Sequence, residues 1–143
     1  MRKWIITAVI MLILVGILLP TISFTEDRDT VQLARVIYAL SRNESYDVKL
    51  AIGSVVMNRV ESKWFDNTLA GVLDDPHQFP AGERYDEESL NAAHAVVSGT
   101  RNLDRSLLYY HSSSEKKQSE TGLTVGSYEF STTDRLLTIT GLL

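Results

Sequence analysis

Apolar residues recur at helical spacing in the first part of the polar region of the chain. Between residues 33 and 44 they fall at intervals of three and four residues, which predicts an amphipathic helix. The face consists of Leu33, Val36, Ile37 and Leu40, and Glu44 follows on the same face. We expect the helix to begin after a cap at Asp29 or Thr30. It should end near Asn43, a residue that tolerates a left-handed backbone.

Two more helices and a few strands are predicted downstream. The second helix is indicated by the apolar positions Val48, Ile52, Val55, Val56 and Val60. The third should start at Asp86 with an acidic first turn and stop at Gly99. Its predicted inner face comprises Leu90, Ala93, His94 and Val97, with His94 more typical of a core histidine than of a metal ligand. Residues 106–110 and 124–130 resemble short strands around a polar loop, which indicates a mainly helical α+β domain with a small sheet.

The N-terminus has a different pattern. Residues 4–24 form a run of 21 uncharged residues behind Arg2 and Lys3. This length is about the ~20 residues that cross a bilayer as a helix. The pattern predicts a single-pass signal anchor at the cell membrane, or alternatively a signal peptide that is cleaved and leaves the protein secreted. Because basic residues stay cytoplasmic, the rest of the chain is expected to be extracytoplasmic.

Charge and composition exclude several classes of function. The chain contains no cysteine, so thiol nucleophiles, disulfides and Cys-ligated metals are excluded. Without Arg2 and Lys3, twelve basic residues face eighteen acidic ones, which argues against nucleic acid as a partner. The histidines are dispersed, and residues 74–77 are more typical of a solvated turn than of an acidic site, so we predict neither a metal nor another cofactor. Glu44 is the carboxylate of interest, because partial burial at a helix end would favour general-acid chemistry. Composition alone favours the alternative, a surface glutamate near a helix end.

The residues also resemble a known family. Residues 33–60 contain L-A-R-V-I-Y-A, S-R-N-E-S-Y and A-I-G-S-V-V-M-N-R-V, and further matches are F-D-N-T-L-A-G-V at residues 65–72, the pair Gln78-Phe79, L-L-Y-Y at residues 107–110 and G-S-Y-E-F at residues 126–130. These segments are similar to the SleB/CwlJ-type bacterial cell wall hydrolases, known from spore-cortex-lytic enzymes. The resemblance divides the chain into a leader (1–24), a spacer and helix start (25–32), a cell-wall-hydrolase-like domain (33–130) and a C-terminal tail (131–143).

The resemblance implies a small lysozyme-related domain that cleaves peptidoglycan glycan strands between N-acetylmuramic acid and N-acetylglucosamine, as a muramidase or lytic transglycosylase. One glutamate at the end of the first helix would act as general acid. At that position this chain has Leu40, whereas the second glutamate of the family motif matches Glu44. We therefore predict Glu44 as the catalytic residue, displaced by about one helical turn. The terminal histidine of the family pattern is replaced by Tyr128.

Substrate contacts are predicted at Ser41, Gln78 and Phe79. Phe79 could present a stacking face to a sugar, with Gln78 bonding an acetamido group, or Phe79 could simply belong to the core. Two functions remain open: glycan cleavage that uses Glu44, or a catalytically inactive, membrane-tethered protein that binds peptidoglycan or regulates a partner. A structural envelope protein without glycan contact is the third option.

Overall fold

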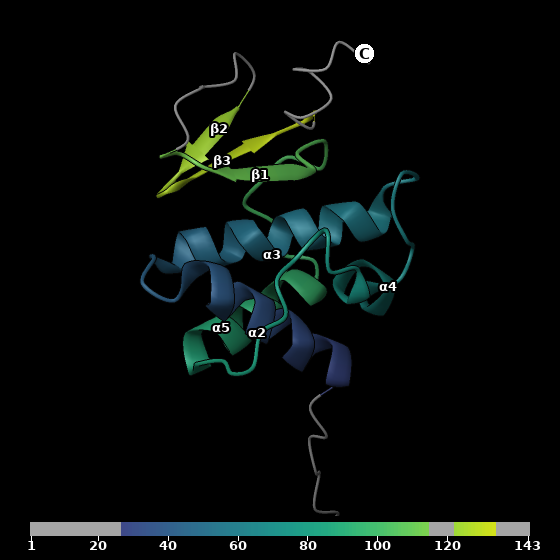
Figure 1. The fold of residues 1–143 in the computed structure, drawn as a ribbon, viewed down its shortest axis with the longest axis vertical. Helices are drawn as coiled ribbons and strands as arrows, with labels where there is room; N and C mark the ends of the chain where they lie inside the picture. Colours follow the sequence, from purple (N-terminus) through teal and green to yellow (C-terminus); the bar gives the residue numbers. More distant parts are fainter. Residues whose placement is uncertain (1–26, 115–121, 134–143) are drawn as a thin grey trace, which may run out of the picture.

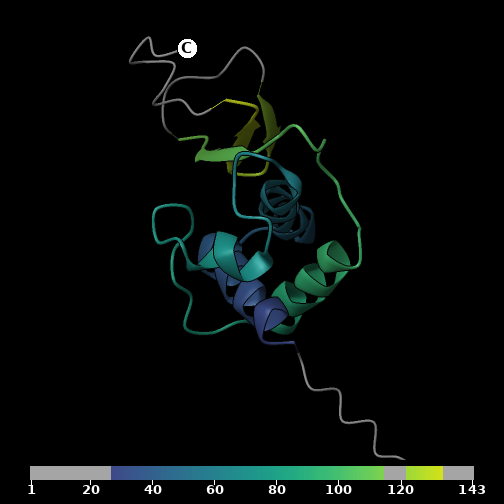
Figure 2. The same cartoon turned by 90° about the vertical axis from the view of Figure 1, so that its right-hand side faces the viewer.

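Helix α3 (Tyr46–Glu61) lies at the centre of the fold. The structure is a computed structural model that describes residues 27–114 and 122–133. The other elements are α2 (Arg28–Ser41), α4 (Leu69–Asp74), α5 (Glu87–Val97), β1 (Tyr109–Ser112), β2 (Leu123–Val125) and β3 (Tyr128–Ser131). Figures 1 and 2 show the sheet on one side of α3 and the remaining helices on the other. This arrangement is the α+β fold expected from the apolar pattern.

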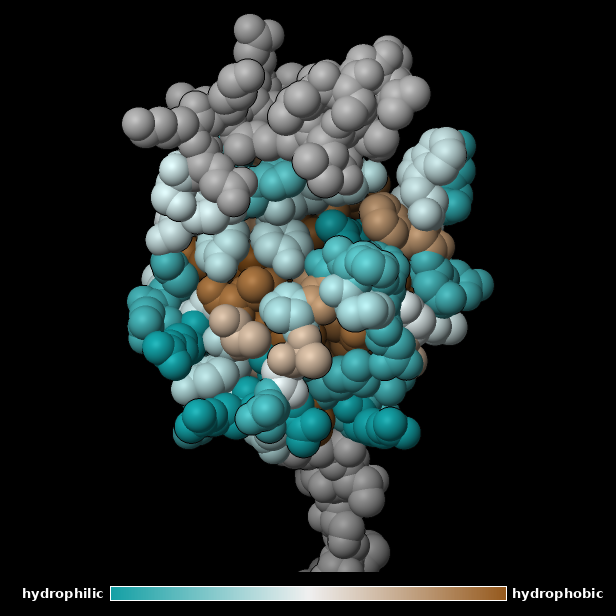
Figure 3. All heavy atoms as spheres, viewed as in Figure 1, coloured by the Kyte–Doolittle hydropathy of each residue, from teal (hydrophilic) through white to brown (hydrophobic). Residues whose placement is uncertain are grey.

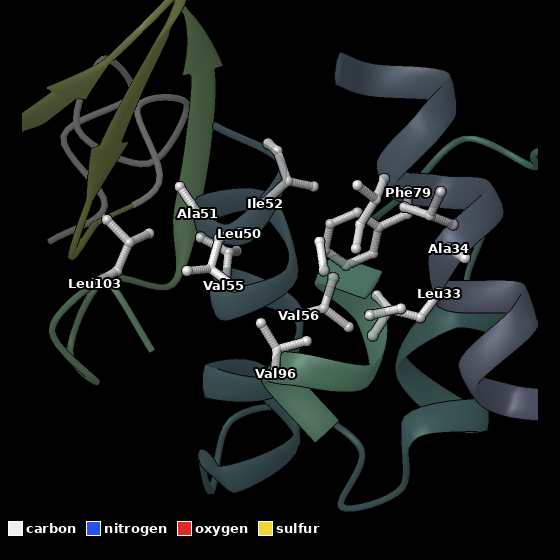
Figure 4. Close-up of a cluster of buried hydrophobic side chains, with 14 of the residues drawn as sticks. Leu33, Ala34, Leu50, Ala51, Ile52, Val55, Val56, Phe79, Val96 and Leu103 are labelled. Atoms are coloured by element: carbon white, nitrogen blue, oxygen red, sulfur yellow. The ribbon is translucent and has the colours of Figure 1, made fainter. Parts of the chain in front are cut away.

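Burial on both sides explains the composition of α3. In its middle part, nearly all side chains around the helix are buried, so this part of the helix has no solvent-facing side. Most of these side chains are apolar or small. Gly53 allows α5 to approach closely: a Cβ at this position would lie 3.0 Å from Val96 and 3.2 Å from Ile37. The tightly packed layer between α2, α3 and α5 is drawn in Figure 4.

Helix α2 starts and ends earlier than predicted. Its N-cap is Asp27, so the predicted caps at Asp29 and Thr30 are wrong by two or three residues. The Thr30 hydroxyl instead donates to the Asp27 carboxylate over 3.4 Å. The helix stops at Ser41, which places Glu44 in the turn before α3 rather than on the helix. Asn43 has no positive φ, so the left-handed conformation expected there is also wrong.

The buried face of α5 is rotated relative to the prediction. Asp86 caps the helix as expected, and its carboxylate accepts the Ser89 N–H over 2.7 Å. The inner face, however, comprises Ser89, Ala92, Ala93 and Val96. His94 is exposed and Val97 is 40% exposed, so the expectation of a core histidine is wrong. The small side chains face inward because α2 and α3 both pack closely against this helix.

The sheet is antiparallel with the order β1-β3-β2. Strand β3 pairs with both neighbours, with Tyr110 opposite Phe130 and Val125 opposite Tyr128. The predicted strand 124–130 is in fact interrupted by a tight turn at Gly126 and Ser127, because Gly126 has a φ of +57°. The short helix α4 was not predicted; its N-cap is Thr68, whose hydroxyl accepts the Gly71 N–H.

Within residues 27–114 and 122–133, no helix has the length and apolar character needed to cross a membrane. The predicted signal anchor at residues 1–24 lies outside these residues, as does most of the C-terminal tail.

Candidate functional site

Glu44 lies where the turn between α2 and α3 meets the hairpin of β2 and β3. Its carboxylate is half-buried, and Oε1 accepts a hydrogen bond of 2.6 Å from the Ser127 hydroxyl. The hairpin approaches so closely that a Cβ on Gly126 would lie 2.9 Å from Glu44 Oε2 and 2.4 Å from Val48 Cγ2. Glycine is therefore required at this position by both its positive φ and the space available. The carboxylate is held in one place while remaining reachable from solvent.

A buried lysine fixes the backbone of this turn. The Lys49 side chain is only 1% exposed, and its ammonium donates to the carbonyl oxygens of Ser41 and Glu44, each over 3.1 Å. The ammonium also lies 3.2 Å from the carboxylate of Glu88, which is exposed on α5. Lys49 thus satisfies the carbonyl that ends α2 and sets the position of Glu44. Sequence reasoning missed Lys49, because a lysine within an apolar pattern is normally expected on the surface.

Tyr128 connects β3 with the last turn of α2. Its hydroxyl donates to the Leu40 carbonyl over 2.7 Å. Burial raises the pKa of Tyr128, and the negative charge of Glu44 raises it further. The phenol therefore stays neutral and remains a hydrogen-bond donor well above neutral pH. Tyr128 therefore bonds the backbone of Leu40 and lies close enough to Glu44 to be influenced by its charge.

The side chain of Leu40 forms an apolar part of the same region. It is partly buried and packs against the core, as do Tyr110, Val125 and Tyr128 from the sheet. Figure 3 shows an apolar area in the middle of the face that it draws, below the sheet. Leu40 carries no proton to donate, whereas Glu44, four residues later, carries a carboxyl group.

Gln78 and Phe79 belong to a neighbouring packing unit. The Gln78 amide accepts from Arg59 over 3.2 Å and donates to Asp75 over 2.8 Å. Phe79 is 2% exposed, and its ring stacks on Tyr110 with the centroids 5.6 Å apart. Figure 4 shows the Phe79 ring among the buried side chains next to α2 and α3. This burial agrees with the core interpretation of Phe79, and the residue also borders a cavity beside α2. Its contact with a sugar stays a prediction.

Ser41 is also turned inward. It is 1% exposed, and its hydroxyl donates to the Ile37 carbonyl over 2.6 Å, within the same helix. The hydroxyl is therefore not exposed in this structure, and a substrate contact of Ser41 stays a prediction. The hydroxyl that accompanies Glu44 belongs to Ser127 instead. The signal for Ser127 was present in the sequence, since it lies inside the G-S-Y-E-F segment at residues 126–130.

The Asn58-Arg59 pair of α3 anchors the sheet side of the molecule. Asn58 donates to the carbonyl oxygens of Asp104 and Leu107, and Arg59 donates to that of Leu108 over 2.7 Å. The guanidinium of Arg59 also lies 4.7 Å from the Phe79 ring centroid. Both side chains are buried, so the pair holds the segment that leads into β1.

Gln78 is joined to the Glu44 region through a chain of aromatic residues. The Gln78 carbonyl accepts the Tyr110 hydroxyl over 3.3 Å, and the Tyr110 and Tyr128 ring centroids are 6.1 Å apart. Burial raises the pKa of Tyr110 despite the opposing charge of Arg59.

In the part of the chain that the structure describes, no group of three or more histidine or acidic residues is placed to hold a metal ion.

Comparisons with known proteins agree with this architecture. A spore cortex-lytic enzyme of Bacillus subtilis (strain 168) is 35% identical over 89 residues, which are 59% of this chain and 29% of that enzyme. A spore cortex-lytic enzyme of Oceanobacillus iheyensis is 32% identical over 87 residues, 57% of this chain and 32% of that enzyme. The chain thus spans about a third of the length of these relatives.

Solved structures show the same fold. The catalytic domain of the Bacillus cereus SleB protein matches with a TM-score of 0.62 and 26% identity, over 72% of this chain and 88% of that domain. The catalytic domain of the germination-specific lytic transglycosylase SleB from Bacillus anthracis matches in fold with a TM-score of 0.63, over 76% of this chain and 98% of that domain, at 24% identity. The sequence profile described as Cell Wall Hydrolase matches residues 43–130, more than half of the chain. The chain therefore belongs to the cell wall hydrolase family.

Proposed function

We propose that this domain cleaves peptidoglycan glycan strands and that Glu44 donates the proton to the glycosidic oxygen. The observation that carries the proposal is the fixed carboxylate of Glu44, which the Ser127 hydroxyl bonds over 2.6 Å at the junction of helix and sheet. This junction lies within the segment that matches the family. A carboxyl that is positioned by protein contacts and still reachable from solvent suits proton transfer to a polymer.

The chemistry requires a single carboxyl group. In its protonated form Glu44 would protonate the oxygen between N-acetylmuramic acid and N-acetylglucosamine as the C1–O bond breaks. The resulting carboxylate would then take a proton from the attacking oxygen. Attack by water gives hydrolysis, as in a muramidase, whereas attack by the muramyl 6-hydroxyl gives a 1,6-anhydro product, as in a lytic transglycosylase. No covalent enzyme intermediate is needed, so a second catalytic carboxylate is not required.

The location of this activity follows from the N-terminal segment. We propose that residues 4–24 anchor the protein in the cell membrane as a single pass, with the domain on the outer side, because Arg2 and Lys3 favour the cytoplasm. Cleavage of the segment as a signal peptide would release the same domain to the wall. Finding the full-length chain in the soluble cytoplasmic fraction would contradict both versions.

A direct test uses the full-length chain in a neutral detergent with insoluble peptidoglycan. Mass analysis of the released muropeptides would distinguish hydrolysis from anhydro-forming cleavage. We expect Glu44→Gln to reduce the release about 10²–10⁴-fold, the usual contribution of a general acid. Glu87→Gln is the matched control, because Glu87 is an exposed carboxylate on α5. Wall lysis that survives Glu44→Gln in a folded protein would refute the assigned role.

The second candidate function is binding without cleavage, and Leu40 is the observation that favours it. In the family pattern this position carries the glutamate that acts as acid, and here it carries an apolar side chain packed on the core. A membrane-tethered domain of this kind would bind glycan strands or regulate a partner enzyme. Co-sedimentation of the protein with the wall, without any released muropeptide, would support this function over the first.

A further inference from the structure

Four arginines line two adjoining cavities on the outer side of α2. Arg28 and Arg35 contribute to a cavity of about 540 Å³, and Arg42 and Arg84 contribute to one of about 240 Å³. Ala81 and Gly82 border both cavities, so the two form one groove between α2 and the loop before α5, which we term the arginine groove. Glu44 lines neither cavity. Figure 1 shows this loop, in teal, passing over α2 on its way to α5.

The loop is seated firmly on the helix. A Cβ on Gly82 would lie 2.3 Å from the Arg35 carbonyl oxygen, so the loop backbone is in direct contact with α2. Three of the arginines follow each other at seven-residue intervals along the helix, which corresponds to about 10 Å per step. They therefore lie in a row along the groove, and Arg84 faces them from the loop.

These arginines differ from the other cations that the structure describes. Elsewhere the cations have partners within the protein: Lys49 with Glu88, Arg101 and Arg105 with Glu61, Lys63 over the Trp64 ring, and Arg59 with Leu108 and Gln78. Among residues 27–114 and 122–133, the four arginines of the groove form neither an ion pair nor a side-chain hydrogen bond. In a domain with a clear excess of acidic residues, unpaired cations gathered at one groove indicate an anionic ligand.

The acidic residues of the groove do not cancel this charge. Asp74 lines the larger cavity, and its carboxylate accepts a hydrogen bond of 2.9 Å from Gln32. Glu83 lines the smaller one. Two carboxylates therefore oppose four guanidinium groups. Because guanidinium groups bind carboxylates through paired hydrogen bonds, the groove suits a ligand that carries several carboxylates.

We propose that the arginine groove binds the acidic peptide stems of peptidoglycan. This inference rests on the proposed function, since it requires a glycan strand at Glu44. Arg42 precedes Glu44 by two residues, and Ala39 in the same cavity wall directly precedes Leu40. A stem attached to a bound strand is therefore held near the groove, which raises its effective concentration there. The groove would make the protein select muramic acid residues that carry a peptide over bare ones.

The test measures binding separately from cleavage. Full-length Glu44→Gln protein in a neutral detergent is titrated with two probes: soluble glycan strands that carry acidic stems, and the same strands after an amidase has removed the stems. We expect the strands with stems to bind about tenfold tighter or more, with a preference that weakens as salt rises. When the double substitution Arg35→Gln/Arg42→Gln is added to the Glu44→Gln protein, the preference for strands with stems should be abolished. Lys63→Gln is the matched control and should retain it, since Lys63 is an exposed cation outside the groove.

Three results would overturn the inference. The first is equal binding of both probes, and the second is a preference that survives Arg35→Gln/Arg42→Gln in a protein with unchanged thermal stability. The third is that poly(glycerol phosphate) or anionic lipid vesicles bind in an arginine-dependent manner while the stems have no effect, which would assign the groove to a phosphate-bearing partner. None of these results depends on whether Glu44 acts as the acid, because all binding is measured without cleavage.

Discussion

Replacing Leu40 by glutamate should raise glycan cleavage, if the helix end retains the geometry of the family. The introduced carboxyl would stand near the end of α2, and Glu44 stands in the turn that follows this helix. If the two carboxylates come within about 6 Å of each other, they repel by about 3 kcal/mol at an effective dielectric constant of about 20. This repulsion disfavours the state in which both carboxylates are charged, so it favours a pair that keeps one proton. A general acid requires such a proton.

The same substitution should cost stability. Leu40 is partly buried against the core, and its carbonyl remains bonded to Tyr128. The loss of apolar burial and the incomplete solvation of the new carboxyl together predict a decrease of about 1–3 kcal/mol in the free energy of unfolding. Denaturant titration would measure this change. A loss of this size should leave the domain folded at room temperature.

The assay is the release of new glycan ends from insoluble peptidoglycan between pH 5 and pH 8. We expect Leu40→Glu to increase the rate at least about tenfold at the acidic end of this range, and the gain to fade as pH rises, because a general acid has to be protonated. Leu40→Gln is the control, because glutamine has nearly the same shape and cannot donate the proton. A folded Leu40→Glu protein without any gain, or an equal gain from Leu40→Gln, would refute the reasoning.

Three further predictions concern the supports of the site. Lys49→Met should lower the free energy of unfolding by about 3 kcal/mol, because two carbonyl oxygens lose a charged donor, whereas Lys63→Met should change it by less than about 0.5 kcal/mol in the same denaturant titration. Gly126→Ala should destabilise the protein by about 1–3 kcal/mol and reduce wall cleavage, and unchanged thermal unfolding would contradict the close approach of the hairpin. Because the pKa of Tyr128 is raised, the unfolded state should ionise first as pH rises above about 10, so the free energy of unfolding should fall from there upward. Tyr128→Phe should make this alkaline decline shallower and cost about 1 kcal/mol at neutral pH, and an unaltered pH profile would count against it.

The sequence predicted the helices better than their ends and faces. The apolar patterns that begin at Leu33 and Val48 predicted α2 and α3 near their observed positions, because each of these helices buries many apolar side chains. The predicted inner face of α5 was shifted by one residue. The observed face includes Ser89 and Ala92, and such small residues contribute little to an apolar pattern. Helix α4 was missed because it is short and is stabilised by its cap and by packing against α3 rather than by its own periodicity.

The site was only partly predictable for a similar reason. Glu44 could be singled out from its place in the motif, but the partners that fix it come from other elements. Ser127 is 83 residues away along the chain, and only the fold brings it to the carboxylate. Lys49 was missed because its buried ammonium is stabilised by two backbone carbonyl oxygens of the turn after α2. The positions of these oxygens cannot be read from the order of residue types. The burial of Phe79 could not be predicted, because an aromatic residue after a turn is equally suited to the core and to a sugar contact.

The buried Asn58-Arg59 pair has a consequence for how proteins of this kind are recognised from sequence. The pair belongs to the most specific segment of the family resemblance, and in this fold it anchors the segment leading to β1 without touching Glu44 in any contact described above. A search that relies on this segment detects the scaffold, whatever residue stands at the helix end. The profile match begins at residue 43 and includes this pair. A match to this segment therefore reports the scaffold, and whether a given member is active has to be judged from the carboxylates near the end of its first helix.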